Sequence, residues 1–425
     1  MKSIRIVSTI AWIGCAGAIG LSNYFFRSTF SDAFFAFALA SIIIIHLRLH
    51  PKIADALLIP AIGGLLAFVN FKLLHDPWVP IALLAFLGFS SFMLLGIRAI
   101  WASEGQRKLL TYGFVAALLF LSSDWMASTF LDWTSAAHSR VLDLYLYYFD
   151  ASLGFQASFA LGAAFLRSAA LRTAGLLFYI ALAIPIALVF SALILRKTRA
   201  GVEAMAAFLI TGPVGVLFYN LFPALGPVHV FTRFYPFHPL TMEQLIRLRI
   251  GPIAAQGPMN AMPSLHMAWV LLAWWYARGL SWTNRIIVAA FVAFTVVATL
   301  GTGEHYLIDL VVAFPFALMI QAICSAWLDW KKGPRLEAFL IGLLTTLAWL
   351  VLLRYCSRLF WTSMVVPWAL VIATVVVCWL RSYGLQAALD PEDRVGGVVA
   401  ARTTNVQAQT VDTRDAASIP SPHQS

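Results

Sequence analysis

The chain has 425 residues and a formal charge of +10 at pH 7, and 61% of its residues are hydrophobic while only 11% are charged. Soluble domains usually contain about 25% charged residues, so the composition excludes an ordinary soluble protein. Apolar runs of about 18 residues or more, each long enough to cross a bilayer as a helix, recur along the chain and predict a polytopic membrane protein.

In chain order, the apolar runs predict about 12 transmembrane helices and therefore an all-α membrane helix bundle. The predicted helices are 4–26, 31–49, 53–75, 78–101, 109–131, 172–195, 202–222, 262–279, 284–302, 305–328, 336–356 and 361–381. The stretch from Asp132 to Leu171 is less regular and has an aromatic cluster just before Asp150. We expect this stretch to be interfacial or re-entrant.

The pattern divides the chain into four parts. Residues 1–131 form N-terminal membrane helices without an evident role, and residues 132–330 contain polar residues gathered at helix ends. Residues 331–385 contribute two more membrane helices, and residues 386–425 form a polar tail that we expect to be disordered.

Short basic loops predict the orientation of the bundle. Twelve crossings place five of these loops on one side, which the positive-inside rule makes cytoplasmic together with both termini. The loops contain Arg48 and Lys52; Arg98, Arg107 and Lys108; Arg196, Lys197 and Arg199; Arg278 and Arg285; and Lys331, Lys332 and Arg335. The excess of positive charge is thus a topology signal, and we expect no nucleic-acid partner.

Three polar clusters interrupt the later helices, at 220–227, 262–268 and 301–309. With the predicted crossings, all three lie on the extracytoplasmic face. Helix ends that are distant in sequence are therefore expected to meet in one pocket.

The third cluster contains His305 and Asp309, which are four residues apart and so share one face of a helix. A carboxylate that accepts the Nδ1 proton leaves Nε2 of the imidazole unprotonated and nucleophilic. A purely structural His–Asp pair is the alternative, although an ionisable pair at a membrane helix end favours function.

The second cluster contains Pro263, Ser264, Leu265 and His266. Proline suits the first helical position, so backbone N–H groups near Ser264 and Leu265 are expected to be free to bind phosphate at a helix N-terminus. His266 is the candidate general acid for a leaving oxygen. Separately, Ser264 could equally be a helix cap and His266 a polar wall residue.

These motifs resemble the type 2 phosphatidic acid phosphatase superfamily, in particular the branch of the inositol phosphorylceramide synthases. The matching residues are Pro263 to His266 and His305 to Leu310, with Phe222 to Pro227 as a weaker upstream match. The resemblance covers roughly residues 140–330 and implies a six-helix catalytic core within 132–330. It also implies that His305 forms a phosphohistidine, that Asp309 orients it, that His266 is the general acid, and that no metal or other cofactor takes part.

One departure from the superfamily concerns phosphate binding. Its lipid phosphatases carry a Lys, six residues and then Arg-Pro upstream, and no such run occurs near Pro223. This favours a transferase of the inositolphosphotransferase type, which passes the phosphoryl group or head group to an alcohol or lipid acceptor. Arg233, Arg247 and Arg249 are the available cations in the following loop, and we favour Arg247 or Arg249.

The leading hypothesis is therefore an enzyme that acts on a lipid phosphate or phospholipid at the extracytoplasmic face. A phosphatase for phosphatidate, sphingoid or polyprenyl phosphates is the first alternative. The second alternative is a transporter or a non-catalytic membrane scaffold. Proton relays in transporters usually lie near mid-membrane, whereas these ionisable residues lie at helix ends.

Overall fold

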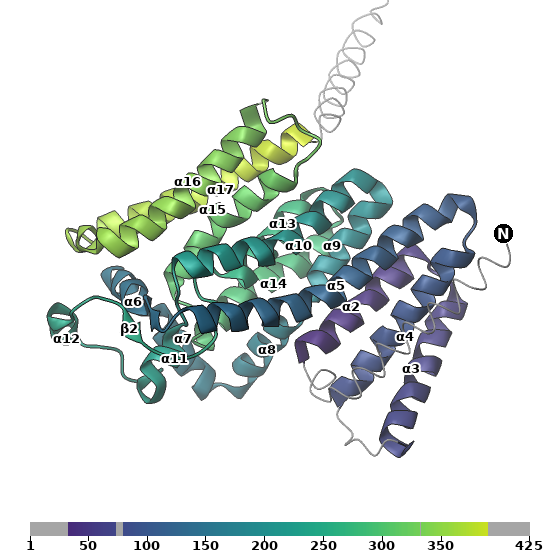
Figure 1. Ribbon diagram of the computed structural model, residues 1–425, viewed down its shortest axis with the longest axis horizontal. Coiled ribbons are helices and arrows are strands. Elements are labelled where there is room, and N and C mark those ends of the chain that lie inside the picture. The colour runs from purple at the N-terminus through teal and green to yellow at the C-terminus, as the bar shows by residue number, and fades with distance from the viewer. Residues whose placement is uncertain (1–32, 74–79, 332, 390–425) are drawn as a thin grey trace, which may run out of the picture.

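The computed structural model describes residues 33–73, 80–331 and 333–389, and this part of the chain is almost entirely helical (Figure 1). The predicted all-α class is confirmed. The helices are α2 (Ala33–Leu49), α3 (Ile53–Leu73), α4 (Pro80–Trp101), α5 (Glu104–Ala137), α6 (Asp143–Ser152), α7 (Ala157–Arg167), α8 (Ala169–Ile180), α9 (Ala183–Arg196), α10 (Thr198–Leu221), α11 (Pro227–Phe231), α12 (Met242–Arg247), α13 (Leu265–Tyr276), α14 (Trp282–Gly301), α15 (Leu307–Cys324), α16 (Gly333–Tyr355) and α17 (Val365–Leu389).

Several of these helices can cross a membrane. Among the described residues, 7 helices are long and apolar enough, and the number rises to 9 if each of two bent helix pairs is one span. The chain is therefore an integral membrane protein. The predicted helix at 4–26 and most of the predicted tail, 390–425, lie outside the described residues.

Two bent pairs replace parts of the prediction. The predicted helix 172–195 is two helices, α8 and α9, which meet at 46°. Pro185 lies in the first turn of α9 and has no N–H for a helical hydrogen bond, so the break had a sequence signal. Farther upstream, α6 and α7 meet at 90°, as a broken span or a re-entrant loop. Such an irregular arrangement was predicted for the Asp132 to Leu171 stretch.

Helix α15 lies at the centre of the bundle. It packs against α10, α13, α16 and α17, and 83% of its most apolar window is buried. The approach of α16 is especially close, because a Cβ on Gly342 would lie 2.6 Å from Met319 N. Small residues at such contacts bring helices together where the lipid supplies no hydrophobic driving force.

Helices α2, α3 and α4 form a group on one flank of the bundle (Figure 1). Helix α2 packs against α4, α5 and α9, while α3 packs against α4. A Cβ on Gly88 would lie 2.2 Å from the carbonyl carbon of Leu39, so α4 and α2 are in backbone contact there. One continuous cluster of buried apolar residues joins this flank to the central helices.

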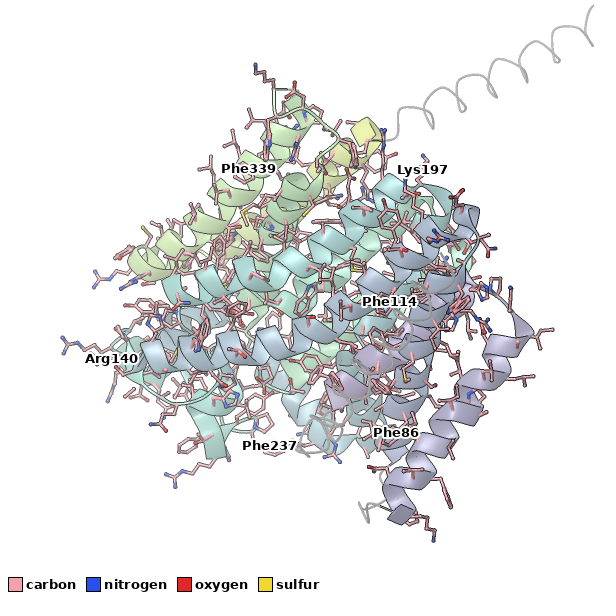
Figure 2. The ribbon with its side chains drawn as sticks, turned by 45° about the vertical axis from the view of Figure 1, so that its right-hand side comes forward. Phe86, Phe114, Arg140, Lys197, Phe237 and Phe339 are labelled. Atoms are coloured by element: carbon pink, nitrogen blue, oxygen red, sulfur yellow. The ribbon has the colours of Figure 1, made fainter. Side chains whose placement is uncertain are left out.

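The short elements gather at one end of the bundle, which we call the site end (Figure 1). Strands β1 (Arg140–Val141) and β2 (Ile253–Ala254) pair there in antiparallel register, with Arg140 opposite Ala254. Figure 2 shows Arg140 pointing outward at this end and Lys197 at the other. Segments far apart in sequence are thus fixed around the ends of α10, α13 and α15.

Candidate active site

The candidate nucleophile lies in the short connection between α14 and α15. His305 is 1% exposed, and its Nδ1 lies 3.0 Å from the backbone carbonyl oxygen of Ala261. Asp309 Oδ2 is farther from the same nitrogen, at 3.5 Å. The nearest proton acceptor for Nδ1 is therefore a backbone carbonyl, while the carboxyl group of the predicted partner Asp309 lies slightly farther away.

The opposite nitrogen of His305 faces a hydroxyl. Nε2 lies 3.2 Å from Ser264 Oγ, in a fully buried contact. With the Nδ1 proton donated to Ala261, Nε2 carries the lone pair and accepts from the hydroxyl. Burial lowers the pKa of His305 to about 4, so the imidazole is neutral at pH 7. A neutral imidazole with a free Nε2 lone pair is the form that a nucleophile requires.

The N-terminus of α13 is built differently from the prediction. Pro263 precedes the N-cap, Ser264 is the N-cap, and Leu265 is the first helical residue. Ser264 Oγ accepts from Met267 N at 3.4 Å, and the Ser264 N–H donates to Asp309 O at 3.2 Å. The Ser264 N–H is thus not free for phosphate, and its side chain is both a helix cap and a partner of His305.

His266 follows two residues after Ser264 and lies among aromatic rings. Its imidazole stacks on Tyr179 with the ring centroids 4.0 Å apart and an interplanar angle of 16°. Phe34 and Trp269 lie around it at centroid distances of 6.1 and 6.0 Å. Neither Tyr179 nor Phe34 was predicted to lie here, because both belong to helices that are distant from His266 in sequence. His266 is the second residue of α13, and His305 contacts the Ser264 N-cap, so both candidate histidines lie at the N-terminal end of α13.

The upstream cluster joins the same place through its backbone. Ala261 N donates to Ala224 O at 3.1 Å, and Val228 N donates to Gly303 O at 3.0 Å. Gly226 has a φ of 107°, and a Cβ there would lie 2.3 Å from Glu304 O. Only glycine fits this conformation and this close approach. The three polar clusters therefore meet, as the helix-end argument predicted.

Two buried carboxylates that the sequence analysis did not place in the site hold this arrangement together. Asp143 accepts from the N–H groups of Leu225 and Gly226 at 3.1 and 2.8 Å, and from the Tyr306 hydroxyl at 3.2 Å. It thus connects the upstream cluster to the residue that follows His305. An acidic residue at the start of an otherwise apolar segment was the signal that could have found it.

Asp150 and Asp309 satisfy the first backbone donors of α15. Asp150 accepts from Leu307 N at 2.7 Å and from Ile308 N at 3.2 Å, and Asp309 accepts from Tyr306 N at 2.7 Å. Carboxylates suit a helix N-terminus because its free N–H groups carry partial positive charge. Three carboxyl groups, those of Asp143, Asp150 and Asp309, therefore hold the residues that follow His305.

The candidate phosphate-binding arginines lie apart from this centre. Arg247 is exposed and pairs with Glu243 at 2.6 Å, Arg249 is exposed, and Arg233 lies over the Phe234 ring at 5.1 Å. The structure therefore gives no contact between these cations and the histidines. Gly226 and Ala261, which begin and end the same loop, contact the residues around His305, whereas the three arginines do not.

A titratable pair, His229 and Glu304, lies next to His305 in the structure. His229 Nε2 is 3.3 Å from Glu304 Oε2, and both side chains are about a quarter exposed, at 27% and 26%. The hydrogen bond to Glu304 raises the pKa of His229 above its usual value. This pair places a titratable cation at the accessible edge of the polar cluster, which the sequence analysis did not anticipate.

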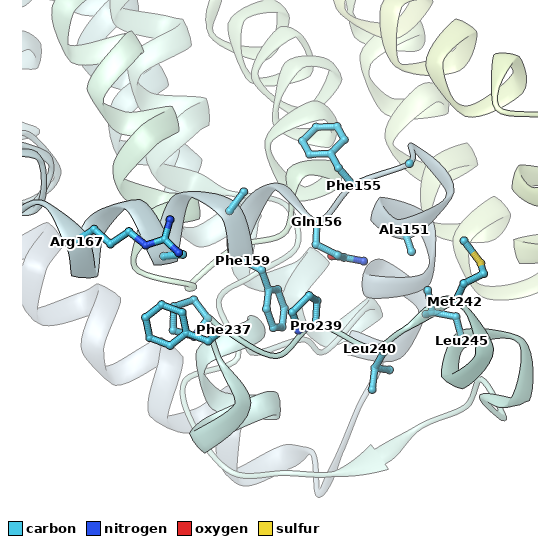
Figure 3. Close-up of a pocket in the computed structure, with 14 residues that line it drawn as sticks. Ala151, Phe155, Gln156, Phe159, Arg167, Phe237, Pro239, Leu240, Met242 and Leu245 are labelled. Carbon is cyan, nitrogen blue, oxygen red and sulfur yellow. The ribbon is translucent and has the colours of Figure 1, made fainter.

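A cavity of about 460 Å³ lies near the site end between α6, α7 and the 236–245 segment (Figure 3). Phe159, Phe237 and Leu240 are among the residues that line the cavity, and Figure 3 shows Arg167 at one side of this group. Ser158, the neighbour of Phe159, donates its hydroxyl to His305 O at 2.9 Å. The start of α7 is thus a shared wall between this largely apolar cavity and the backbone of the candidate nucleophile.

Comparison with known families agrees with the motifs. Residues 144–323 match the family model described as the PAP2 superfamily. The match includes both histidines, Asp309 and Asp150, and it supports assignment of this segment to the type 2 phosphatidic acid phosphatase superfamily. Searches among curated proteins and among solved structures found no significant match to the chain.

Proposed function

We propose that this integral membrane protein is a lipid phosphotransferase in which His305 Nε2 forms a covalent phosphohistidine. The observation that carries the proposal is the orientation of His305, with Nδ1 at 3.0 Å from a carbonyl oxygen and Nε2 directed to a hydroxyl at the N-terminus of α13. The superfamily match at 144–323 supports phosphatase or phosphotransferase chemistry for this segment.

The reaction proceeds in two displacements. The Nε2 lone pair attacks phosphorus, an N–P bond forms, and the P–O bond to the leaving alcohol breaks. His266 has to carry an extra proton, as an imidazolium, when the phosphate is bound, and it donates that proton to the leaving oxygen. An acceptor alcohol then attacks the phosphohistidine, loses its proton to His266, and releases His305. Ser264, which touches Nε2, adds a hydroxyl donor for a phosphate oxygen.

The proposal gives Asp309 an electrostatic role. Phosphorylation at Nε2 makes the ring cationic, because Nδ1 keeps its proton. The Asp309 carboxylate at 3.5 Å stabilises that charge, and the Ala261 carbonyl fixes the tautomer. The interactions of the ring with Asp309 and with the Ala261 carbonyl become stronger as positive charge develops on the ring. Interactions that are stronger in the transition state than in the ground state lower the barrier of the chemical step.

Transfer to an alcohol, and not to water, is the favoured outcome because the Lys, six residues and Arg-Pro of the lipid phosphatases do not occur near Pro223. The burial of His305, which is 1% exposed, also limits the access of bulk water to a reactive intermediate. Hydrolysis of a lipid phosphate remains the alternative activity, and it uses the same covalent intermediate. The two differ only in the nucleophile of the second step.

The test uses the purified full-length chain with a ³²P-labelled lipid phosphate, with and without inositol or diacylglycerol as acceptor. We expect an acid-labile labelled protein and label transfer to the acceptor, whereas release of phosphate alone indicates a phosphatase. His305→Ala should remove the label and turnover, while His238→Ala, at an exposed histidine in the loop, is the matched control.

A second arm tests the general acid. His266→Ala should slow the departure of a poor alkoxide leaving group far more than that of nitrophenolate, which leaves without protonation.

Turnover by His305→Ala close to that of His238→Ala would refute the covalent mechanism. If His238→Ala loses labelling as well as His305→Ala, the loss reflects a folding defect. Size-exclusion chromatography in detergent checks the folding of each variant.

A further inference from the structure

A separate group of polar side chains, His46, His50 and Asp55, lies among the N-terminal helices. The sequence left the role of these helices open. Asp55 Oδ2 lies 3.3 Å from His46 Nε2 and 2.6 Å from His50 Nδ1. All three side chains are buried, with residue exposures of 0% for His46, 5% for His50 and 0% for Asp55. Two imidazole nitrogens and one carboxylate oxygen therefore converge on one point inside the helix group.

This cluster is remote from the candidate active site. Phe34, in the first turn of α2, lies beside His266, whereas His46 is in the last turn of the same helix. At 1.5 Å per residue, these two positions are roughly 18 Å apart along the helix axis. The cluster thus belongs to the opposite end of the bundle, where α2 ends and α3 begins.

We propose that His46, His50 and Asp55 form a binding site for a divalent transition-metal ion, with Zn²⁺ as the best fit. The three donor atoms all lie within 4.8 Å of one another. In tetrahedral coordination at about 2.0 Å, Zn²⁺ requires donors roughly 3.3 Å apart. The His46–Asp55 distance already has this value, and the His50–Asp55 pair has to open by roughly 0.7 Å.

The outer contacts are those of a metal centre. Ser91 Oγ lies 3.1 Å from His46 Nδ1, the nitrogen that faces away from the cluster. Arg98 Nε donates at 3.0 Å to Asp55 Oδ1 and so holds the second carboxylate oxygen. Groups that orient the far nitrogen of a ligating histidine and the far oxygen of a carboxylate commonly support metal sites.

The protonation state that binds a metal is compatible with the contacts around His46. Metal binding requires His46 Nε2 and His50 Nδ1 to be unprotonated, so each ring carries its proton on the other nitrogen. His46 Nδ1–H then donates to Ser91, because a hydroxyl can accept as well as donate. Arg98 is 34% exposed, so solvent screens its repulsion of the ion.

The site joins three helices. His46 and His50 come from the end of α2 and the residue after it, Asp55 from the first turn of α3, and the orienting Arg98 from the last turn of α4. A bound ion therefore crosslinks the N-terminal group at one end. This role is structural and is independent of the proposed histidine chemistry at the site end.

The test measures metal content and affinity in the full-length chain, purified with a tag that contains no histidine. Wild type should bind one Zn²⁺ per chain by elemental analysis, and Co²⁺ should give the visible absorption of a four-coordinate centre. His46→Gln and Asp55→Asn should lose the ion, whereas His238→Gln, an exposed histidine, should retain it. Ser91→Ala should weaken affinity by about 10- to 100-fold.

Thermal unfolding supplies an independent readout in case a variant folds poorly. Zn²⁺ should raise the melting temperature of wild type and of His238→Gln, and should leave that of Asp55→Asn unchanged. Wild type that binds no more Zn²⁺ than folded Asp55→Asn, with no Zn²⁺-dependent change in melting temperature, would overturn the proposal. The cluster would then be a hydrogen-bonded ion pair only.

Discussion

Substituting Gly226 tests whether the upstream cluster positions the candidate nucleophile. Gly226 has a φ of 107°, and a Cβ there would lie 2.3 Å from Glu304 O, where ordinary contacts begin at 3.4 Å. In Gly226→Ala the Glu304 backbone must therefore retreat by about 1.1 Å, the difference between those two distances. Because His305 is the next residue, its imidazole should move by a comparable amount.

The expected loss follows from that displacement. A misplacement of about 1 Å can reduce catalysis by roughly 100-fold, or about 2.7 kcal/mol in the barrier. Alanine at φ 107° and ψ 159°, a backbone region that is almost exclusive to glycine, adds roughly 1–3 kcal/mol of instability. The assay is transfer of ³²P from a lipid phosphate, together with thermal unfolding in detergent.

Gly251→Ala is the matched control, since Gly251 lies in the same long loop and a Cβ there meets nothing within 4 Å. We expect this variant to retain wild-type turnover and stability. If Gly226→Ala folds and its turnover is within about twofold of that of Gly251→Ala, the positioning argument is refuted, because 100-fold is expected from the displacement.

Three further predictions concern other parts of the chain. Asp150→Ala removes the acceptor of two backbone N–H groups of α15 and should lower the free energy of unfolding by roughly 3–6 kcal/mol. Chemical denaturation measures this loss, and a loss below about 1 kcal/mol would contradict the role of Asp150 as that acceptor. Because Glu304 raises the pKa of His229, the pair should stabilise the protein fully below the unfolded pKa of about 6.5, and this stabilisation should be lost as the pH rises through the higher pKa of the folded state. Glu304→Gln should abolish this pH dependence of stability, and an unchanged pH profile in the variant would argue against the pair. Thr241→Cys, in a background without other cysteines, should react with an impermeant thiol reagent in intact cells, whereas labelling only after permeabilisation would reverse the predicted topology.

Much of the architecture could be predicted because membrane helices are encoded locally. A run of about 20 apolar residues satisfies its own backbone hydrogen bonds and crosses the bilayer with little regard to its neighbours. Hence the extents of α3, α4, α10 and α14 agree closely with the predicted runs. The break between α8 and α9 was missed although Pro185 marked it, because the apolar composition continues across the bend.

The candidate site was only partly predictable for the opposite reason. His266, His305 and Asp309 were found because their spacing at helix ends has a chemical meaning in one segment. The partners that orient them come from elsewhere: the Ala261 carbonyl for His305 and the Tyr179 ring for His266. A backbone carbonyl has no residue-type signal at all. The arginines of the loop were preferred by charge alone, and the structure leaves them exposed.

The sequence by itself determined the membrane class, most helix extents and the residue types that can perform phosphoryl transfer, because hydropathy and short-range spacing are local properties. Tertiary structure decided which atoms face one another. It brought Asp143 to the upstream cluster, Asp150 to the start of α15, and Asp55 between His46 and His50. Buried carboxylates need partners to offset the loss of water, and those partners are supplied by the packing of helices that the sequence alone does not pair.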